Sequence, residues 1–358
     1  MKLLINNDVC GSKTKEEREY SDLNSNSSIS GEILSVILIN SAVTYMSLRR
    51  EIRAAIPSSE LKRLGMRRVF LLAKPNLNSN PTTTKTPKEN SKLSPNRKKQ
   101  KTDNSKAFMP TMRMIEEENS EYSDIVLGNL TDAYKNNTYK HLMGLHWATS
   151  FCATAKYVMK MDDDVNVDFY QLHYIIMESR KNSSRTIGPR NKTNSATTQK
   201  QQTPAPFLPS KVGTVKDLIR ALQEREKLGV DGKLEKSRFI LGRKLNRARI
   251  NRDNKFKWYI TAEQHPEPFL PNYVHGPFYM TTIRSIPGLL NQVQNIRFLW
   301  IDDPHVTGSL REAAGIDLID ASPLFTMHDR YVKCCSQAMN HHNQVRRQCY
   351  SHHNVGLS

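Results

Sequence analysis

Short, mostly apolar runs alternate along this chain with segments of helical periodicity. Such runs stand at residues 33–39, 67–73, 124–127 and 157–161. Each has the length and composition of a buried strand. Strands that alternate with helices form a mainly parallel sheet with helices on both faces. We therefore expect an α/β fold of this kind, in which ligands bind at the carboxyl ends of the strands.

Helical segments lie between and after these runs. In the first of them, Leu48, Ile52 and Ile56 recur at every fourth position and share one face, and Pro57 ends the helix. The expected helices are residues 47–56, 131–150, 169–179 and 310–314, and two later strands are expected at 239–242 and 257–261.

The net charge of +18 is confined to two tracts. Residues 74–113 carry +8 and residues 180–257 carry +15, so the rest of the chain carries −5. Both tracts are rich in small polar residues and Lys, a composition that buries too little apolar surface to offset chain entropy. We expect disordered basic insertions at about 75–112 and 181–236. An anionic surface is the alternative partner of these tracts, but aromatic residues do not alternate with the basic ones as nucleic-acid stacking requires.

The remaining chain has the size of one large domain. We expect this domain to span residues 31–335, after a disordered polar leader at 1–30 and before a C-terminal tail at 336–358. No apolar run reaches the ~18 residues of a transmembrane helix. The first apolar run, Leu3 to Ile5, is also shorter than the ~7 residues of a secretory signal core.

Five cysteines leave at least one thiol unpaired within the chain. They are Cys10, Cys152, Cys334, Cys335 and Cys349, and no two of them have the two-residue gap of a metal-binding knuckle. In an oxidising compartment, we expect Cys152 to pair with one of the three C-terminal cysteines.

Three adjacent acids, Asp162, Asp163 and Asp164, directly follow the strand at 157–161. Because alternate side chains of an extended segment share a side, Asp162 and Asp164 converge while Asp163 faces away. Hard oxygen ligands suit Mg²⁺ or Mn²⁺, which commonly bridges two phosphate groups. The pattern is typical of a nucleotide-sugar site, where the metal stabilises the leaving diphosphate. An ordinary acidic turn after a strand is the alternative.

A second acid pair, Asp302-Asp303, follows the apolar residues 297–301. A carboxylate at the edge of an apolar pocket has a raised pKa, which suits a general base near neutral pH. Such a base could remove the proton of an acceptor hydroxyl on the face opposite the leaving group, so that displacement inverts the anomeric carbon. The alternative is that one of the two aspartates caps the turn through 306–310.

An ordered set of motifs surrounds the two acid groups. It comprises residues 121–125 (Glu-Tyr-Ser-Asp-Ile), 132–140 (Asp-x-Tyr-x-Asn-x-Thr-x-Lys), 152–165 (Cys-x-x-Ala-x-Tyr-x-x-Lys-x-Asp-Asp-Asp-Val), 257–259 (Lys-Trp-Tyr) and 301–308 (Ile-Asp-Asp-Pro-His-Val-Thr-Gly). This set resembles the beta-1,3-galactosyltransferase family, Golgi hexosyltransferases with an Asp-Asp-Asp motif.

The resemblance implies a nucleotide-diphospho-sugar transferase fold, GT-A-like and Rossmann-like. It also implies an inverting enzyme that moves galactose or N-acetylglucosamine from a UDP-hexose donor to a glycan acceptor on protein or lipid, in a beta-1,3 linkage. Asp303 matches the family's catalytic base. A Golgi membrane or luminal location is implied too, although the membrane anchor typical of the family is absent from this sequence.

Further residues receive roles in donor and metal binding. Arg49 and Arg53 resemble the family's nucleotide segment, and guanidinium groups suit phosphate; a solvated helix face is the alternative. We expect Lys140 to act likewise or to pair with the acids, and we place Asp163 with these donor-binding residues. Mn²⁺ is expected on Asp162 and Asp164.

Two interpretations stay open for the remaining candidates. His328 is either a third metal ligand or a surface histidine. Trp258 and Tyr259 either stack on a sugar ring or pack in the core, whereas Trp147 is expected in the core. For the whole chain, the rival to the enzyme is a catalytically inactive pseudo-transferase or a basic anion-binding protein.

Overall fold

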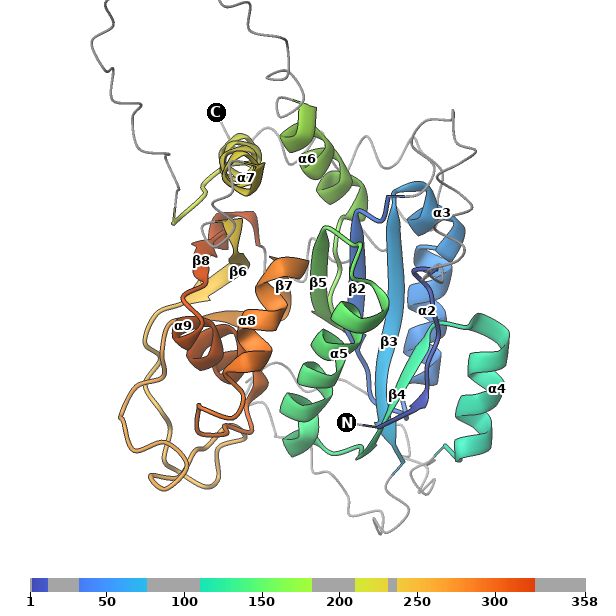
Figure 1. Cartoon of the computed structure of the whole chain (residues 1–358). Coiled ribbons are helices and arrows are strands. Elements are labelled where there is room, and N and C mark those ends of the chain that lie inside the picture. Colours follow the sequence, from blue (N-terminus) through green and yellow to red (C-terminus); the bar gives the residue numbers. More distant parts are fainter. Residues whose placement is uncertain (1, 12–31, 76–109, 182–209, 231–236, 326–358) are drawn as a thin grey trace, which may run out of the picture.

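The computed structural model describes residues 2–11, 32–75, 110–181, 210–230 and 237–325, through which an eight-stranded sheet runs (Figure 1). The strands are β1 (Leu3–Ile5), β2 (Ser35–Asn40), β3 (Met66–Lys74), β4 (Ile125–Thr131), β5 (Tyr157–Asp162), β6 (Phe239–Leu245), β7 (Tyr273–Thr282) and β8 (Asp317–Asp320). The α-helices are α2 (Met46–Ala55), α3 (Ser58–Arg63), α4 (Met112–Tyr122), α5 (Asn137–Phe151), α6 (Phe169–Lys181), α7 (Val215–Val230), α8 (Ile286–Asn291) and α9 (Arg311–Ala313). A π-helical segment, Pro304–Leu310, precedes α9.

The sheet has the order β1-β4-β3-β2-β5-β7-β6-β8, and Figure 1 shows the strands from β4 to β8 in this order. β2 is parallel to both β3 and β5, β3 is parallel to β4, and β6 is parallel to β8. β7 runs antiparallel between β5 and β6. The mostly parallel α/β sheet expected from the alternating pattern is thereby confirmed. Asn40 pairs with Asp162, so β2 and β5 reach their carboxyl ends side by side.

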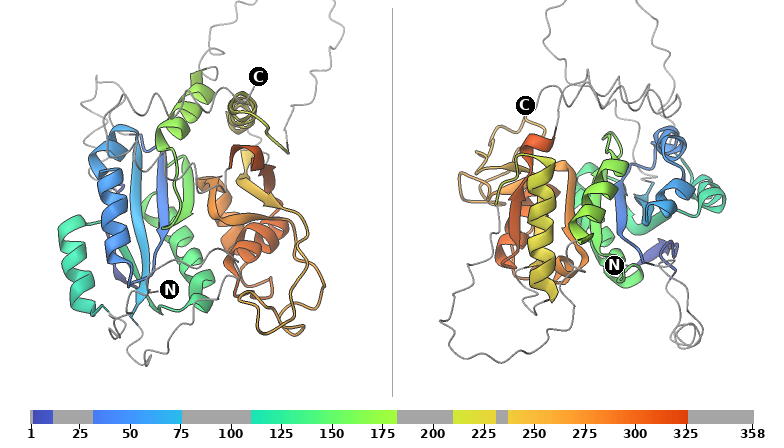
Figure 2. Two further views of the ribbon diagram at one scale, coloured as in Figure 1. Left: turned by 180° about the vertical axis from the view of Figure 1, so that it is seen from behind. Right: turned by 90° about the horizontal axis from the view of Figure 1, so that it is seen from above.

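Helices cover both faces of the sheet (Figures 1 and 2). In β5, Tyr157, Met159 and Met161 pack with residues of α3, α6 and α7 on one face. The intervening Val158 packs with α5, α8 and the π-helical segment on the other. This period of two divides the core into two layers, and it assigns the even-numbered side chains of β5 to the face that α5 covers.

The structure confirms the expected strands at 33–39, 67–73, 124–127, 157–161 and 239–242, each of which overlaps an observed strand. The expected strand at 257–261 is wrong. Those residues belong to the long loop between β6 and β7, where the amide of Tyr259 donates to the carbonyl of Phe256 at 3.1 Å. Aromatic residues are common in strands, but Trp258 is 44% exposed on this loop.

The N-terminal residues correct two expectations. Part of the expected disordered leader forms β1, which pairs antiparallel with β4. Cys10 forms a disulfide with Cys152, so the expected bridge from Cys152 to a C-terminal cysteine is wrong. Pairing of β1 with the sheet brings Cys10 to the end of α5, a contact across 142 residues that local sequence could not indicate. The three C-terminal cysteines lie outside the described residues.

Helix α7 corrects the limits of the second basic insertion, which we expected to be disordered through residue 236. Leu218, Ala221 and Leu222 of α7 are buried in the core layer that α7 shares with α6 and one face of the sheet. The high local charge hid this narrow apolar stripe, because the charged residues occupy its other faces. Residues 76–109 and 182–209 of the two insertions lie outside the described residues. No helix in the described parts of the chain is long and apolar enough to span a bilayer.

Candidate active site at the carboxyl edge of the sheet

The acid triplet stands where β5 ends. Its side chains differ in exposure: Asp162 is partly buried, Asp163 is 9% exposed, and Asp164 is exposed. Only Asp162 belongs to β5, whereas Asp163 and Asp164 form the turn that follows, so the extended segment expected through Asp164 ends at Asp162. Burial raises the pKa of Asp162 and of Asp163, and the other carboxylates raise both further. The carboxylates therefore need positive charge nearby in order to ionise together.

Lys160 supplies that charge and connects the two acid groups. It lies two residues before Asp162 in β5 and so faces the same side of the sheet. Its Nζ donates to Asp162 Oδ1 at 2.7 Å and to the carbonyl of Gly276 at 2.8 Å, and it lies 3.9 Å from Asp302 Oδ2. Burial lowers the pKa of Lys160, but the three surrounding aspartates outweigh it and raise that pKa, so the ammonium stays charged.

Asp302 is held by a buried histidine. Its Oδ2 lies 3.0 Å from Nδ1 of His141, whose Nε2 lies 2.7 Å from the hydroxyl of Tyr279. Burial would raise the pKa of Asp302, but Lys160 and His141 outweigh it and hold that pKa below its usual range. Asp302 is therefore the ionised member of the pair, and α5 and β7 both fix its position.

Asp303 has the opposite electrostatic environment. Burial and the neighbouring Asp302 raise its pKa well above the ordinary aspartate value. Its carboxylate faces Gly276, where an added Cβ would fall 2.1 Å from Oδ2. Asp303 precedes the π-helical segment without making a side-chain cap, so the capping alternative is wrong for this residue. Asp302 and Asp303 are adjacent and their pKa values are shifted in opposite directions. In such a pair the group with the raised pKa, here Asp303, can exchange a proton near neutral pH.

A divalent cation at this edge would find two carboxylates that reach solvent, Asp162 and Asp164. Carboxylate oxygens are the ligands that Mg²⁺ and Mn²⁺ prefer, and substrate phosphates commonly complete such sites. The donor set therefore suits a hard cation. Among the described residues, no group of three or more His, Cys, Asp or Glu side chains is arranged to hold a metal by itself. His328 lies outside the described residues.

Lys140 and Asp163 meet the loop that follows β2. Nζ of Lys140 donates to the carbonyl of Ser41 at 2.9 Å and lies 3.4 Å from Asp132 Oδ1. A hydrogen bond from Ser41 lowers the pKa of Asp163 against the effect of burial, while Asp163 Oδ2 has no hydrogen-bond partner among the described residues. Lys140 is 4% exposed, and its charge lowers the pKa of Asp163. Of the two expected roles, phosphate binding and pairing with the acids, the structure favours the second.

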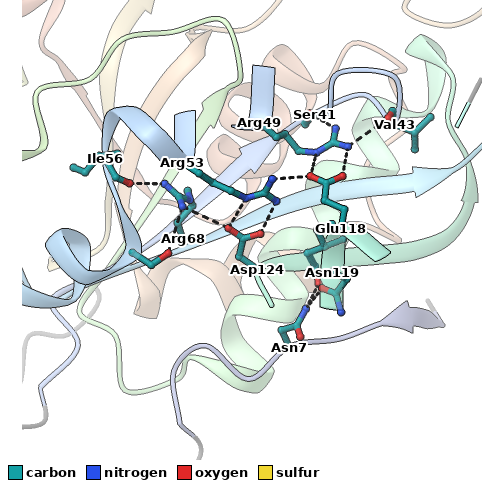
Figure 3. Close-up of polar contacts among 12 residues, drawn as sticks. Asn7, Ser41, Val43, Arg49, Arg53, Ile56, Arg68, Glu118, Asn119 and Asp124 are labelled. Atoms are coloured by element: carbon teal, nitrogen blue, oxygen red, sulfur yellow. Dashed lines mark hydrogen bonds and ion pairs between the residues drawn. The ribbon is translucent and has the colours of Figure 1, made fainter. Parts of the chain in front are cut away.

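Arg49 and Arg53 form a buried ion-pair network, shown in Figure 3. Arg49 binds Glu118 through Nε and Nη2 at 2.8 and 2.7 Å, and its Nη1 donates to the Ser41 hydroxyl at 3.1 Å. Arg53 binds Glu118 at 2.7 Å and Asp124 at 2.7 and 3.0 Å. The exposed fractions of Arg49 and Arg53 are 0% and 7%. Direct contact with a nucleotide and a solvated helix face are therefore both wrong for these arginines.

The network still acts on the site, because Arg49 holds Ser41 and the carbonyl of Ala42 at the carboxyl end of β2. Sequence reasoning missed this role, as well as those of Lys160, His141 and Gly276. Only the role of Lys160 could have been inferred from the sequence, because a residue two positions before Asp162 in a strand faces the same side. The others depend on contacts between segments more than 60 residues apart in the sequence.

Comparison with known proteins connects the chain to a family. The family model described as galactosyltransferase matches residues 102–211 and 215–322, more than half of the chain. Mouse beta-1,3-galactosyltransferase 1 is 24% identical over 200 residues, which are 56% of this chain and 45% of the relative. Rat beta-1,3-galactosyltransferase 4 is 25% identical over 197 residues, which are 54% and 45% of the two chains. This chain thus spans less than half the length of these relatives.

A shorter stretch is more similar to a third relative. Human UDP-GalNAc:beta-1,3-N-acetylgalactosaminyltransferase 1 is 44% identical over 54 residues, which are 15% of this chain and 16% of the relative.

Proposed function

This chain belongs to the galactosyltransferase family, and from that premise we propose that it is an inverting glycosyltransferase. It moves a hexose, galactose or N-acetylglucosamine, from a UDP-sugar to an acceptor sugar hydroxyl in a beta-1,3 linkage. The observation that carries this proposal is the bridge by Lys160, which brings the acid triplet and the acid pair to one side of the sheet edge.

Asp303 is the general base of the proposed reaction. Its carboxylate accepts the proton of the acceptor hydroxyl as that oxygen bonds to the anomeric carbon. The bond from this carbon to the diphosphate oxygen breaks, and UDP leaves with the electron pair. Because the environment raises the pKa of Asp303, its carboxylate is a stronger base than an exposed aspartate. Asp302 stays ionised and fixes the position of the segment that carries Asp303.

Asp162 and Asp164 would hold Mn²⁺, with His328 proposed as a third ligand. The bound ion would supply positive charge to the leaving diphosphate. Lys160 contributes charge from the protein itself, because its buried ammonium stays protonated between the two acid groups. Ser41, held by Arg49, keeps Asp163 and the end of β2 in place beside the donor site.

The disulfide between Cys10 and Cys152 supports an oxidising compartment. We place the protein in the Golgi, in its lumen or on its membrane, where an acceptor glycan on protein or lipid would be available. No nucleic-acid partner is part of this proposal.

A donor and acceptor panel tests the proposed function. The full chain with Mn²⁺ is incubated with UDP-galactose, UDP-N-acetylglucosamine or UDP-N-acetylgalactosamine and a set of glycoside acceptors, and products are analysed by NMR. We expect a β-linked product at the 3-hydroxyl with one donor preferred. An α-linked product, or no transfer from any donor, contradicts the proposal.

A binding experiment separates the enzyme from its rival. The enzyme account expects UDP affinity that requires Mn²⁺ and is lost in Asp164→Ala. Heparin binding that survives Asp164→Ala, together with absent UDP binding, would favour a basic anion-binding protein. UDP binding without transfer would favour an inactive pseudo-transferase.

A further inference from the structure

Exposed aromatic rings from two distant segments meet beside the acid pair. Tyr134, in the turn before α5, is 48% exposed, and Trp258 in the β6–β7 loop is 44% exposed. Nε1 of Trp258 donates to the hydroxyl of Tyr134 at 2.6 Å. Phe256, 43% exposed, packs edge-on against Trp258 with 5.5 Å between ring centroids. We call Tyr134, Phe256 and Trp258 the aromatic platform.

The platform is anchored to the segment that carries the proposed base. The ring of Trp300 packs against Tyr134 with 5.9 Å between centroids, and Trp300 lies two residues before Asp302. Thr138, at the start of α5, donates its hydroxyl to the carbonyl of Trp300 at 2.9 Å. The turn before α5 and the start of α5 therefore both contact Trp300, which leads into Asp302 and Asp303.

Charged residues act on the rings of the platform. Burial raises the pKa of Tyr134 against the hydrogen bond from Trp258, and the negative charges of Asp302 and Asp303 raise it further. Nζ of Lys257 lies 4.6 Å from the ring centroid of Tyr134 and 5.0 Å from that of Trp258. This ammonium holds the two rings together and adds a hydrogen-bond donor at the platform.

A sugar ring matches this surface chemically. Tyr and Trp offer large, rigid apolar faces with few rotamers to lose, together with a polar group at the edge. A hexopyranose has a face of C–H bonds and an edge of hydroxyl groups. Its C–H face can cover an aromatic ring while its hydroxyls remain available to Lys257 and the acids. Packing in the core would instead have buried Trp258, whose ring is almost half exposed.

We propose that the aromatic platform is the acceptor subsite, which takes the terminal β-hexopyranoside of a glycan. Trp258 and Tyr134 pack on the C–H face of that sugar and bring its reacting hydroxyl toward Asp303. The subsite deepens the transferase proposal and rests on it for the role of the bound sugar, while the binding of the sugar is measured separately from catalysis.

Tryptophan fluorescence of the full chain with UDP and Mn²⁺ tests the platform directly. The chain has three tryptophans, and the described structure leaves Trp147 and Trp300 only 1% and 7% exposed. Methyl β-galactoside, methyl β-glucoside and methyl β-N-acetylglucosaminide are titrated separately. We expect one of them to change the emission of wild type, and this change to be lost in Trp258→Phe, which keeps an aromatic ring.

Affinity is then measured by ligand-observed NMR, which does not need the indole. Trp258→Ala should weaken the dissociation constant of that glycoside about tenfold, equivalent to about 1.4 kcal/mol, whereas Trp258→Phe should weaken it less. Tyr174→Ala removes a 54% exposed aromatic on α6 and serves as the matched control that binds like wild type. Equal binding by wild type and Trp258→Ala, or no binding of any glycoside by wild type, overturns the subsite.

The two proposals fail in different ways. Glycoside binding that depends on Trp258, combined with absent transfer, keeps the subsite and contradicts the transferase. Transfer whose acceptor KM does not change in Trp258→Ala keeps the transferase and contradicts the subsite.

Discussion

A Cβ on Gly276 would fall 2.1 Å from Oδ2 of Asp303 and 2.3 Å from Oδ1. β7 thus approaches the acid pair so closely that only a hydrogen atom fits at residue 276. The carbonyl of the same residue accepts a hydrogen bond from Lys160. Gly276 therefore permits β7 to contact both the base and the charge that connects the two acid groups.

Gly276→Ala should displace the carboxylate of Asp303. A shift of about 1 Å at a reacting group can lower the rate about 100-fold, so we expect a loss of that size in kcat. UDP affinity, measured alongside, should change little. Gly213→Ala is the matched control, because its Cβ would meet only Asp217 Oδ2 at 3.8 Å. Equal kcat values for the two variants would contradict the placement of Asp303.

The acidic limb of the pH–rate profile should lie above the ordinary aspartate range. Burial and the charge of Asp302 raise the pKa of Asp303, and a general base works only when deprotonated. Asp302→Asn removes that charge, so the limb should move to lower pH. The profile of kcat/KM against pH measures this shift, with Asp317→Asn on β8 as the control. An unmoved limb would show that Asp302 does not act on the group that titrates.

Asp303→Asn should be more stable than wild type at neutral pH. Since the folded pKa of Asp303 lies above its unfolded value, stability is full below the unfolded pKa and is lost as pH rises toward the folded one. The neutral amide escapes this loss. Urea unfolding from about pH 4 to about pH 8 spans the window above the ordinary aspartate pKa. A stability difference that does not grow with pH would be inconsistent with a raised pKa.

Removal of Glu118 should destabilise the fold and loosen the loop after β2. Glu118→Ala leaves Arg49 and Arg53 buried without a shared partner, and breaking a buried pair costs about 3–5 kcal/mol. Urea unfolding measures this loss in the free energy of unfolding. Glu117→Ala removes a neighbouring acid on the exposed face of α4 and should change little. Similar losses for both variants would mean that the network does not stabilise the fold.

The sequence predicted the elements whose signals are local. The strands at 33–39 and 157–161 are mostly apolar, with Ser35 and Lys160 as the exceptions, so their burial on both faces could be inferred. The acid groups at residues 162–164 and 302–303 stand directly after apolar segments. The first lies at the carboxyl end of β5, and the second lies beside Lys160 and Gly276. Their association was expected only from the resemblance, because no local pattern connects segments so far apart.

The parts that were missed depend on long-range contacts. β7 contains Gly276-Pro277, which reads as a turn, yet it lies between β5 and β6 and contacts the acid pair. The charges of Arg49 and Arg53 indicated a ligand or solvent, whereas Glu118 and Asp124 neutralise them within the core. Neither outcome could be inferred before the partner segments were placed.

The transfer rate of Asp303→Asn tests the central claim most directly. The amide cannot accept the acceptor proton but keeps the size of the side chain. With UDP-hexose, Mn²⁺ and the best acceptor, we expect kcat to fall at least about 100-fold, in the range lost with a general base, while UDP binds with wild-type affinity. Turnover at the wild-type rate would contradict the assignment of Asp303 as the base and, with it, the proposed mechanism.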